Sequence, residues 1–250
     1  MSRLLKKLRP KHGWNAAAWE LAIVTLGVLL AFTAQQWAEN RTLRGKVEAS
    51  KAAIREELAE HYGWAVEFRT VYPCVLAQLD RLRNRVVSSG PQMDPVPIYT
   101  EQNFRFVVRL PSKTFPTSAW DAAVNDGLIQ RFDPSFRRQI VGHYAVIAEL
   151  QRLVSANDET AAGLAALTHR LPIDPTIRYD IVKEIEQFQG RLETLDLDYG
   201  QAIEDIQKVE MLPPADEARA VTERYGTYLF CKAHGLPMRS FEEAMEAVPN

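Results

Sequence analysis

The sequence predicts an all-α protein in which an N-terminal transmembrane helix continues into a multi-helix bundle. First, the apolar run Ala16 to Ala38 has about the 20 residues that a helix needs to cross a bilayer core. Second, most of the remaining chain repeats apolar residues three and four positions apart, the spacing of one helix face. We therefore divide the chain into a basic tail (1–14), a transmembrane helix (15–38) and a helical bundle domain (39–250).

The tail contains only basic charges, and these are Arg3, Lys6, Lys7, Arg9 and Lys11. Lys and Arg favour the cytoplasmic side of a membrane, so we expect the N-terminus inside. Everything from about Glu39 onward then lies outside the cytoplasm, which in a bacterium means the periplasm. Beside a span, a basic tail is a topology signal that contacts anionic headgroups, so we expect no nucleic-acid partner.

A basic tail before an apolar run also fits a cleaved signal peptide. The candidate cleavage point after Ala34, however, has the bulky Phe32 where a small residue is needed. Three tryptophans flank the run as expected for interface anchors, namely Trp14, Trp19 and Trp37. Trp19 and Trp37 would lie about 27 Å apart on a helix that rises 1.5 Å per residue. These features favour an uncleaved anchor.

Within the span, Gly27 and Ala31 are small residues four positions apart, which allows a neighbouring helix to approach closely. Gln35 and Gln36 follow near the outer end and could form hydrogen bonds across helices. We expect these four residues to pack against another transmembrane helix. Small residues are common in such helices, so the pair alone identifies no partner.

The first bundle helix should begin near Ile54, where a heptad-like seam starts. The seam comprises Ile54, Leu58, His61, Ala65, Phe68, Tyr72, Val75, Leu79, Leu82 and Val86. Pro73 lies inside this seam and should kink or end the helix, because proline removes one backbone hydrogen bond.

Two further long helices should begin at Asp133-Pro134 and Asp174-Pro175, where an N-cap acid precedes a proline at the first helical position. Each is followed by an apolar stripe, and the three stripes can be buried only against one another. Shorter elements complete the prediction: a capping box at 118–121, a helix from Asn157 or Asp158 to Arg170, one from Pro214 to His234, and a loop at 88–116 with a short strand at 104–110.

The two cysteines, Cys74 and Cys231, allow two interpretations. In an oxidising compartment an even pair suggests a disulfide, whereas elsewhere both would be small buried thiols. A bridge would close a loop of about 157 residues and would stabilise the fold by roughly 4 to 5 kcal/mol in the chain-entropy model.

The N-terminal pattern resembles that of an uncharacterised, domain-of-unknown-function family of single-pass inner-membrane proteins of Gram-negative bacteria. The resemblance rests on Glu20, the run 27–32 (GVLLAF) and 37–39 (WAE), followed later by 118–120 (SAW) and 127–128 (GL). Gln35 and Gln36 depart from that family's Asn-rich pattern. The resemblance implies a helical protein anchored in the bacterial inner membrane, and it transfers no catalytic residue.

The sequence lacks the common catalytic, nucleotide-binding and redox motifs. It has no Gly-x-Ser-x-Gly, Gly-x-Gly-x-x-Gly, Gly-Lys-Ser/Thr or Cys-x-x-Cys motif. Glu57 and His61 could share a metal, but bundle metal sites use Glu-x-x-His, and Ile140 stands three residues before His143. We expect no catalytic residue, cofactor or metal, a core imidazole at His61, and a solvated glutamate face beside it.

These observations lead to two hypotheses. The preferred one is a non-enzymatic accessory or scaffold protein, held in the lipid bilayer, that binds an integral-membrane complex or a second copy of itself. The alternative is a periplasmic ligand-sensing bundle. Because the cytoplasmic tail is too short to be an output domain, such a sensor would have to act through a partner.

Overall fold

A computed structural model describes residues 13–101, 104–209 and 214–246 of the chain, and it confirms the all-α fold class. The chain forms two compact units, Met1–Lys51 and Ala52–Asn250, which we describe separately. One long helix, α1 (Gly13–Ser88), supplies residues to both.

In the first unit, α1 contains an 18-residue window that is long and apolar enough to cross a membrane. Every side chain described from Ala18 to Asn40 is exposed. The large apolar ones are Trp19, Leu21, Ile23, Val24, Leu26, Val28, Leu29, Leu30, Phe32 and Trp37. The basic residues of the tail and the side chain of Trp14 lie outside the described residues.

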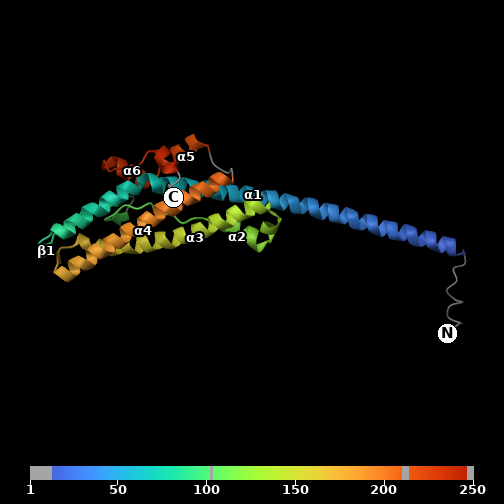
Figure 1. The fold of residues 1–250 in the computed structure, drawn as a ribbon, viewed down its shortest axis with the longest axis horizontal. Coiled ribbons are helices and arrows are strands. Elements are labelled where there is room, and N and C mark those ends of the chain that lie inside the picture. The colour runs from blue at the N-terminus through green and yellow to red at the C-terminus, as the bar shows by residue number, and fades with distance from the viewer. Residues whose placement is uncertain (1–12, 102–103, 210–213, 247–250) are drawn as a thin grey trace, which may run out of the picture. The chain divides into compact units, whose positions relative to one another are not determined.

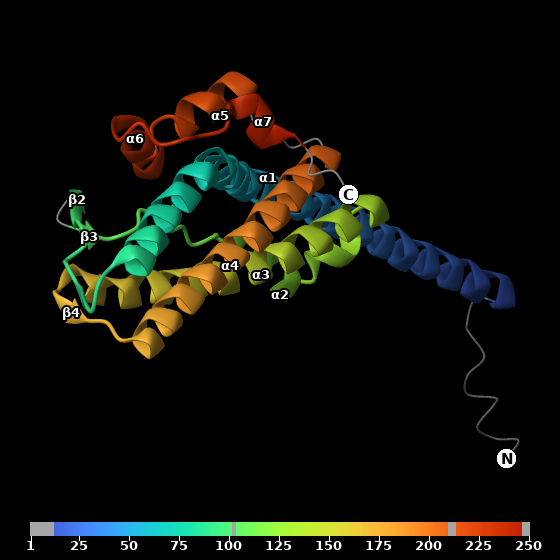
Figure 2. The same ribbon diagram turned by 60° about the vertical axis from the view of Figure 1, so that its left-hand side comes forward.

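In the second unit, the part of α1 from residue 52 onward packs with α3 (Pro134–Gly163) and α4 (Pro175–Lys208). The helices α5 (Ala215–Thr222) and α6 (Gly226–Ala233) lie on the side of α1 away from α3 (Figures 1 and 2). The predicted seam of α1 forms the core, since nine of its ten residues are buried and Tyr72 is half-buried. The stripe of α4 is buried from Ile185 to Ile206, whereas Ile177 at its start is exposed.

The two Asp-Pro signals begin helices as predicted. The Asp133 carboxylate accepts hydrogen bonds from the backbone N–H groups of Ser135 and Phe136. The Asp174 carboxylate accepts one from Ile177 N–H at 2.8 Å. Each cap satisfies donors that the first turn of a helix leaves without a partner.

Three predicted boundaries are wrong. No helix begins at Asn157 or Asp158, because α3 continues to Gly163 and a 3₁₀ turn follows (η3, Leu164–Thr168). The segment 214–234 forms two helices, α5 and α6, rather than one. The predicted capping box at 118–121 is not used, since α2 (Ser118–Asn125) begins one residue earlier than that pattern requires and its N-cap, Thr117, makes no side-chain cap bond.

Pro73 does not end α1, which continues to Ser88. A proline removes the hydrogen bond to the carbonyl four residues earlier, here that of Arg69. Another donor replaces it, since Arg239 Nη1 lies 3.3 Å from the Arg69 carbonyl oxygen. The Arg239 backbone N–H also donates to the Thr70 carbonyl at 3.0 Å. The C-terminal segment therefore compensates the break inside α1, and Figure 2 shows α1 bending within the bundle.

The connection between α1 and α2 carries β1, β2 and β3, while β4 precedes α4. β1 (Gln92–Met93) pairs antiparallel with β4 (Leu171–Pro172), and β2 (Tyr99–Glu101) pairs antiparallel with β3 (Phe104–Phe106). The predicted strand at 104–110 is thus only three residues long. A second 3₁₀ turn, η2 (Leu128–Arg131), and a short capped helix, α7 (Phe241–Met245), complete the fold.

Candidate functional site

Four buried side chains form a polar cluster between α1 and α3, and we call it the Glu57 cluster. Its members are Glu57 and His61 from α1 and His143 and Tyr144 from α3. Trp120 of α2 stacks on Tyr144, with ring centroids 4.7 Å apart. The cluster brings together residues that lie more than 80 positions apart in the sequence.

The two imidazoles form a hydrogen-bonded pair. His61 Nε2 lies 2.8 Å from the Pro116 carbonyl oxygen, and His61 Nδ1 lies 3.0 Å from His143 Nε2. A carbonyl can only accept, so His61 Nε2 carries the proton. When both rings are neutral, His61 Nδ1 accepts from His143 Nε2–H. His143 Nδ1 is then buried with no hydrogen-bond partner among the described residues.

Burial explains why these rings are neutral. Loss of hydration lowers the pKa of His61 to about 4, although its bond to the Pro116 carbonyl acts in the opposite direction. Burial and the neighbouring His61 lower the pKa of His143 to about 3. At neutral pH the pair therefore carries no charge and functions as a hydrogen-bonded part of the core.

The Glu57 carboxylate connects three helices. Its Oε2 accepts from the backbone N–H of Ala119, at the start of α2, at 2.8 Å. Its Oε1 accepts from the Tyr144 hydroxyl, and burial together with this bond raises the pKa of Tyr144. Glu57 thus supplies from α1 the cap that α2 lacks locally. The prediction of a solvated glutamate face is wrong for Glu57, while Glu56 and Glu60 are exposed.

The Glu57 cluster is not arranged as a metal site. In the described part of the chain, no three His, Cys, Asp or Glu side chains lie close enough to bind one ion. His61 is the core imidazole that the sequence predicts, although its partners are a carbonyl and a second imidazole from distant segments. The polar groups of the cluster bind one another, and these hydrogen bonds fix the positions of the helices that carry them.

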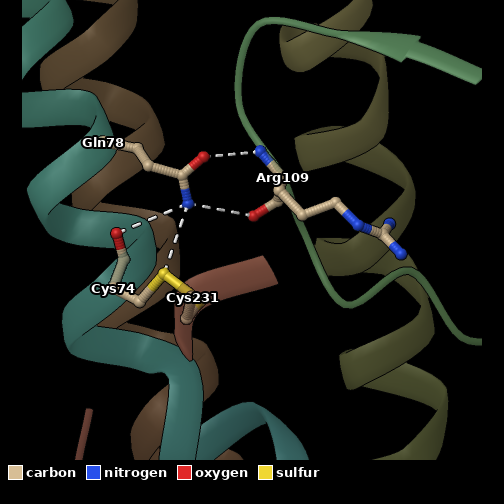
Figure 3. The surroundings of a disulfide bond; sticks show 4 residues. All are labelled: Cys74, Gln78, Arg109 and Cys231. Carbon is tan, nitrogen blue, oxygen red and sulfur yellow. Dashed lines mark hydrogen bonds between the residues drawn. A yellow bond between two sulfur atoms is a disulfide. The ribbon is translucent and has the colours of Figure 1, made fainter. Parts of the chain in front are cut away.

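Cys74 and Cys231 are joined by a disulfide, with their α carbons 6.0 Å apart (Figure 3). The bond ties α1 to α6 and lies completely buried. Beside it, the side-chain amide of Gln78 holds the loop after β3 through two hydrogen bonds to the backbone of Arg109. Its Oε1 accepts from Arg109 N–H at 2.7 Å, and its Nε2 donates to the Arg109 carbonyl at 3.3 Å (Figure 3).

An ion network ties the C-terminal segment to the bundle. Asp196 of α4 accepts two bonds from the guanidinium of Arg239, at 2.5 and 3.0 Å, and lies 3.5 Å from Arg69 Nε. Arg69 Nη1 also donates to the carbonyls of Ala244 and Glu246. These bonds hold α7 against α1 and α4, so their role is structural.

Glu67 is a buried carboxyl group whose Oε2 has no hydrogen-bond partner among the described residues. Burial raises its pKa to about 7, although the charges of Lys113 and Arg109 act in the opposite direction. Lys113 lies over the ring of Tyr225, 4.4 Å from its centroid. Glu67 is therefore the buried acid whose charge changes near neutral pH.

The residues predicted for packing in the span are exposed in the single chain. Gly27 and Ala31 lie four positions apart on the helix, and a Cβ added at Gly27 would meet no atom within 4 Å. Gln35 donates to Glu39 within the same helix at 2.8 Å. Arg41 lies over the ring of Trp37, 5.6 Å from its centroid. The open face at Gly27 leaves room for close approach of another helix.

Sequence reasoning missed the partners of the buried charges and a surface pocket. Glu57 lies three positions after Ile54 and four before His61, so helical spacing was the signal that could have identified it as buried. The pocket lies beside the end of α1 and has a volume of about 520 Å³. It depends on the path of the segment after α1, which no periodic pattern predicts.

Comparison of the chain with protein-family models, curated proteins and solved structures finds no match.

Proposed function

We propose that this protein is a single-pass membrane scaffold, with its N-terminus in the bacterial cytoplasm and its helical bundle in the periplasm. The exposed apolar window of α1 is the observation that carries the proposal. Exposed apolar patches of this extent are rare on soluble monomers, and a lipid bilayer would cover this one. The resemblance of the N-terminal pattern to an inner-membrane family agrees with this assignment.

The bundle supports a scaffold rather than an enzyme. Two of its buried carboxylates, Glu57 and Asp196, bind other side chains and the backbone across helices. A catalytic acid or base must instead reach a substrate from a cleft. We infer that these groups set the shape of a surface that a partner binds.

Two observations support a periplasmic location. The basic residues lie before the span, which favours a cytoplasmic N-terminus. The disulfide between Cys74 and Cys231 belongs to an oxidising compartment such as the periplasm.

Alkaline carbonate extraction and protease protection would test the anchor and its orientation. We expect the full chain to stay in the membrane pellet at high pH. In right-side-out vesicles, protease should digest the bundle and leave a short N-terminal fragment. Release of an intact chain by carbonate, or protection of the bundle, would contradict the proposal.

A substitution pair would test whether the span binds another helix. Gly27→Leu fills the open face, whereas Ala22→Leu adds comparable bulk about 140° around the helix. After mild solubilisation, we expect the native-gel complex of the wild type to dissociate in Gly27→Leu and to persist in Ala22→Leu. Migration of the wild type as a bare monomer, with no partner, would count against the scaffold. Mass spectrometry of the complex would distinguish a second copy from an integral-membrane partner.

The alternative remains a ligand-sensing bundle that acts through a partner. The surface pocket beside the end of α1 is the observation that favours it. Stabilisation of a monomeric chain by a small molecule would support this alternative over the scaffold.

A further inference from the structure

The pocket beside the end of α1 has the size of a small-molecule site. Its volume of about 520 Å³ lies within the roughly 300 to 1,000 Å³ of ligand pockets. The helix supplies one wall and the segment around β2 and β3 supplies the other. The lining residues are Gln78, Arg81, Leu82, Asn84, Arg85, Ser88, Val96, Pro97, Tyr99 and Val107.

The lining divides into an apolar floor and a basic rim. Leu82, Val96 and Val107 are buried and form the floor, while Arg81 and Arg85 are exposed. Tyr99 is held in place by neighbouring rings, since its centroid lies 5.0 Å from that of Phe230. The apolar wall is therefore packed into the fold rather than mobile at the surface.

The two guanidinium groups have different roles. Arg85 Nη2 donates to the carbonyls of Asp94 and Pro95, at 3.4 and 2.7 Å, and so positions the opposite wall. The Arg81 guanidinium forms no hydrogen bond or ion pair with the described residues. Its donors are free to bind a ligand.

The described residues that line the pocket carry positive charge and no negative charge. The lining includes two arginines and no carboxylate. The nearest acids along the chain have other partners, since Asp80 pairs with Arg83 and Asp94 pairs with Arg170. A guanidinium recognises carboxylate and phosphate through paired N–H donors.

We propose that this pocket binds an amphiphilic anion, whose carboxylate or phosphate head contacts Arg81 and whose apolar body lies on the Leu82, Val96 and Val107 floor. The head can belong to a soluble organic acid or to a lipid, and both share this chemistry. The inference does not depend on the proposed scaffold function, because it uses only contacts within the bundle.

Calorimetric titration of the full chain in uncharged phosphatidylcholine nanodiscs, with empty nanodiscs as the blank, would test this site. The probes are 4-butylbenzoate, its uncharged analogue 4-butylbenzyl alcohol, inorganic phosphate and water-soluble dihexanoyl phosphatidylglycerol. We expect 4-butylbenzoate to bind at least about tenfold more tightly than the alcohol or free phosphate, because only it satisfies both rim and floor. Tighter binding of the short-chain lipid would assign the natural source to lipids, and weaker binding would assign it to soluble acids.

Two variants distinguish binding in the pocket from nonspecific attraction of an anion to surface arginines. Arg81→Gln should weaken 4-butylbenzoate binding about tenfold or more. Arg138→Gln removes an exposed arginine of α3, outside the pocket, and should leave binding unchanged. Because Arg81 has no partner in the fold, its variant should keep the wild-type melting temperature. Equal binding of benzoate and alcohol, equal effects of the two substitutions, or no binding of any probe would overturn the proposal.

Discussion

The two parts of α1 contain similar apolar residues, which are exposed in the first part and buried in the second. Leu21 and Leu26, in the first unit, are 68% and 59% exposed, whereas Leu58 and Leu79, in the bundle, are fully buried. The first part is apolar on all sides, which is typical of a helix surrounded by lipid. The second part is apolar along one seam, which is typical of a helix that packs on neighbours. The arrangement of leucines along the helix, rather than their number, therefore distinguishes the candidate membrane span from the bundle helix.

The buried polar groups also differ between the two parts. The first unit contains no buried ionisable side chain among its described residues, while the bundle buries Glu57, His61, Glu67 and His143. The bundle should therefore respond to redox state and pH, and the span should not. Four predictions test the interactions that stabilise the bundle, from the largest expected effect to the smallest.

Loss of the disulfide should have the largest effect. Cys74→Ala with Cys231→Ala should lower the free energy of unfolding of the bundle by roughly 4 to 5 kcal/mol, since the bond closes a loop across 157 positions. Chemical denaturation in mild detergent, followed by circular dichroism, would measure this change. Reductant should destabilise the wild type similarly and leave the double variant unaffected, and membrane retention should not change. Equal stability of both proteins would show that the bond contributes little.

Acidification should destabilise the bundle through His61 and His143. Their pKa values in the fold, about 4 and about 3, lie below the 6.5 of an unfolded chain, so the unfolded state binds protons first as the pH falls. Stability should fall by about 3 to 4 kcal/mol between pH 7 and pH 5. A Glu67→Gln background isolates this loss, because Glu67 titrates with the opposite sign.

His143→Gln should be less stable than the wild type at pH 7 but should lose less stability on acidification. His169→Gln, which removes an exposed histidine, is the matched control and should keep the wild-type pH dependence. An unchanged slope in His143→Gln would contradict the assignment of neutral, buried imidazoles.

Glu67→Gln should stabilise the bundle at alkaline pH. The pKa of Glu67 is raised to about 7 in the fold from 4.5, so its ionisation destabilises the native state as the pH rises through this interval. We expect a gain of about 1 to 3 kcal/mol at pH 8 and a smaller one at pH 5. Urea titrations at both pH values would detect it. A uniform loss at both values would mean that the buried carboxylate is well solvated or paired.

Removal of a helix cap should have the smallest effect. Asp174→Ala deletes the acceptor for Ile177 N–H at the start of α4 and should cost about 1 kcal/mol. Asp180→Ala, an exposed position within the same helix, should change stability by less than about 0.5 kcal/mol. Thermal unfolding of both variants would compare them. Equal effects would assign the loss to helix charge rather than to the cap.

The long elements were predictable because their signals are local. The seam of α1 and the Asp-Pro starts of α3 and α4 depend on residues within a few turns of each other. The boundaries that failed depend on distant partners. Asn157 resembles a cap in sequence, but it lies within α3, and its Oδ1 accepts from Arg191 Nε of α4 at 2.8 Å.

The same distinction applies to the candidate sites. The candidate span and the two cysteines could be identified from composition, and His61 from its place in the seam. The bond from Glu57 to Ala119 N–H, the compensation of Pro73 by Arg239, and the pocket at Arg81 join segments far apart in the chain. Sequence periodicity contains no information about such pairs.

Photolabelling with a diazirine phospholipid would test the comparison between the two parts of α1 most directly. The full chain in lipid bilayers would be irradiated, digested and mapped by mass spectrometry. The account predicts lipid adducts within residues 18–38 and none at the buried seam of residues 54–86. Adducts along the seam, or an unlabelled apolar window, would contradict it.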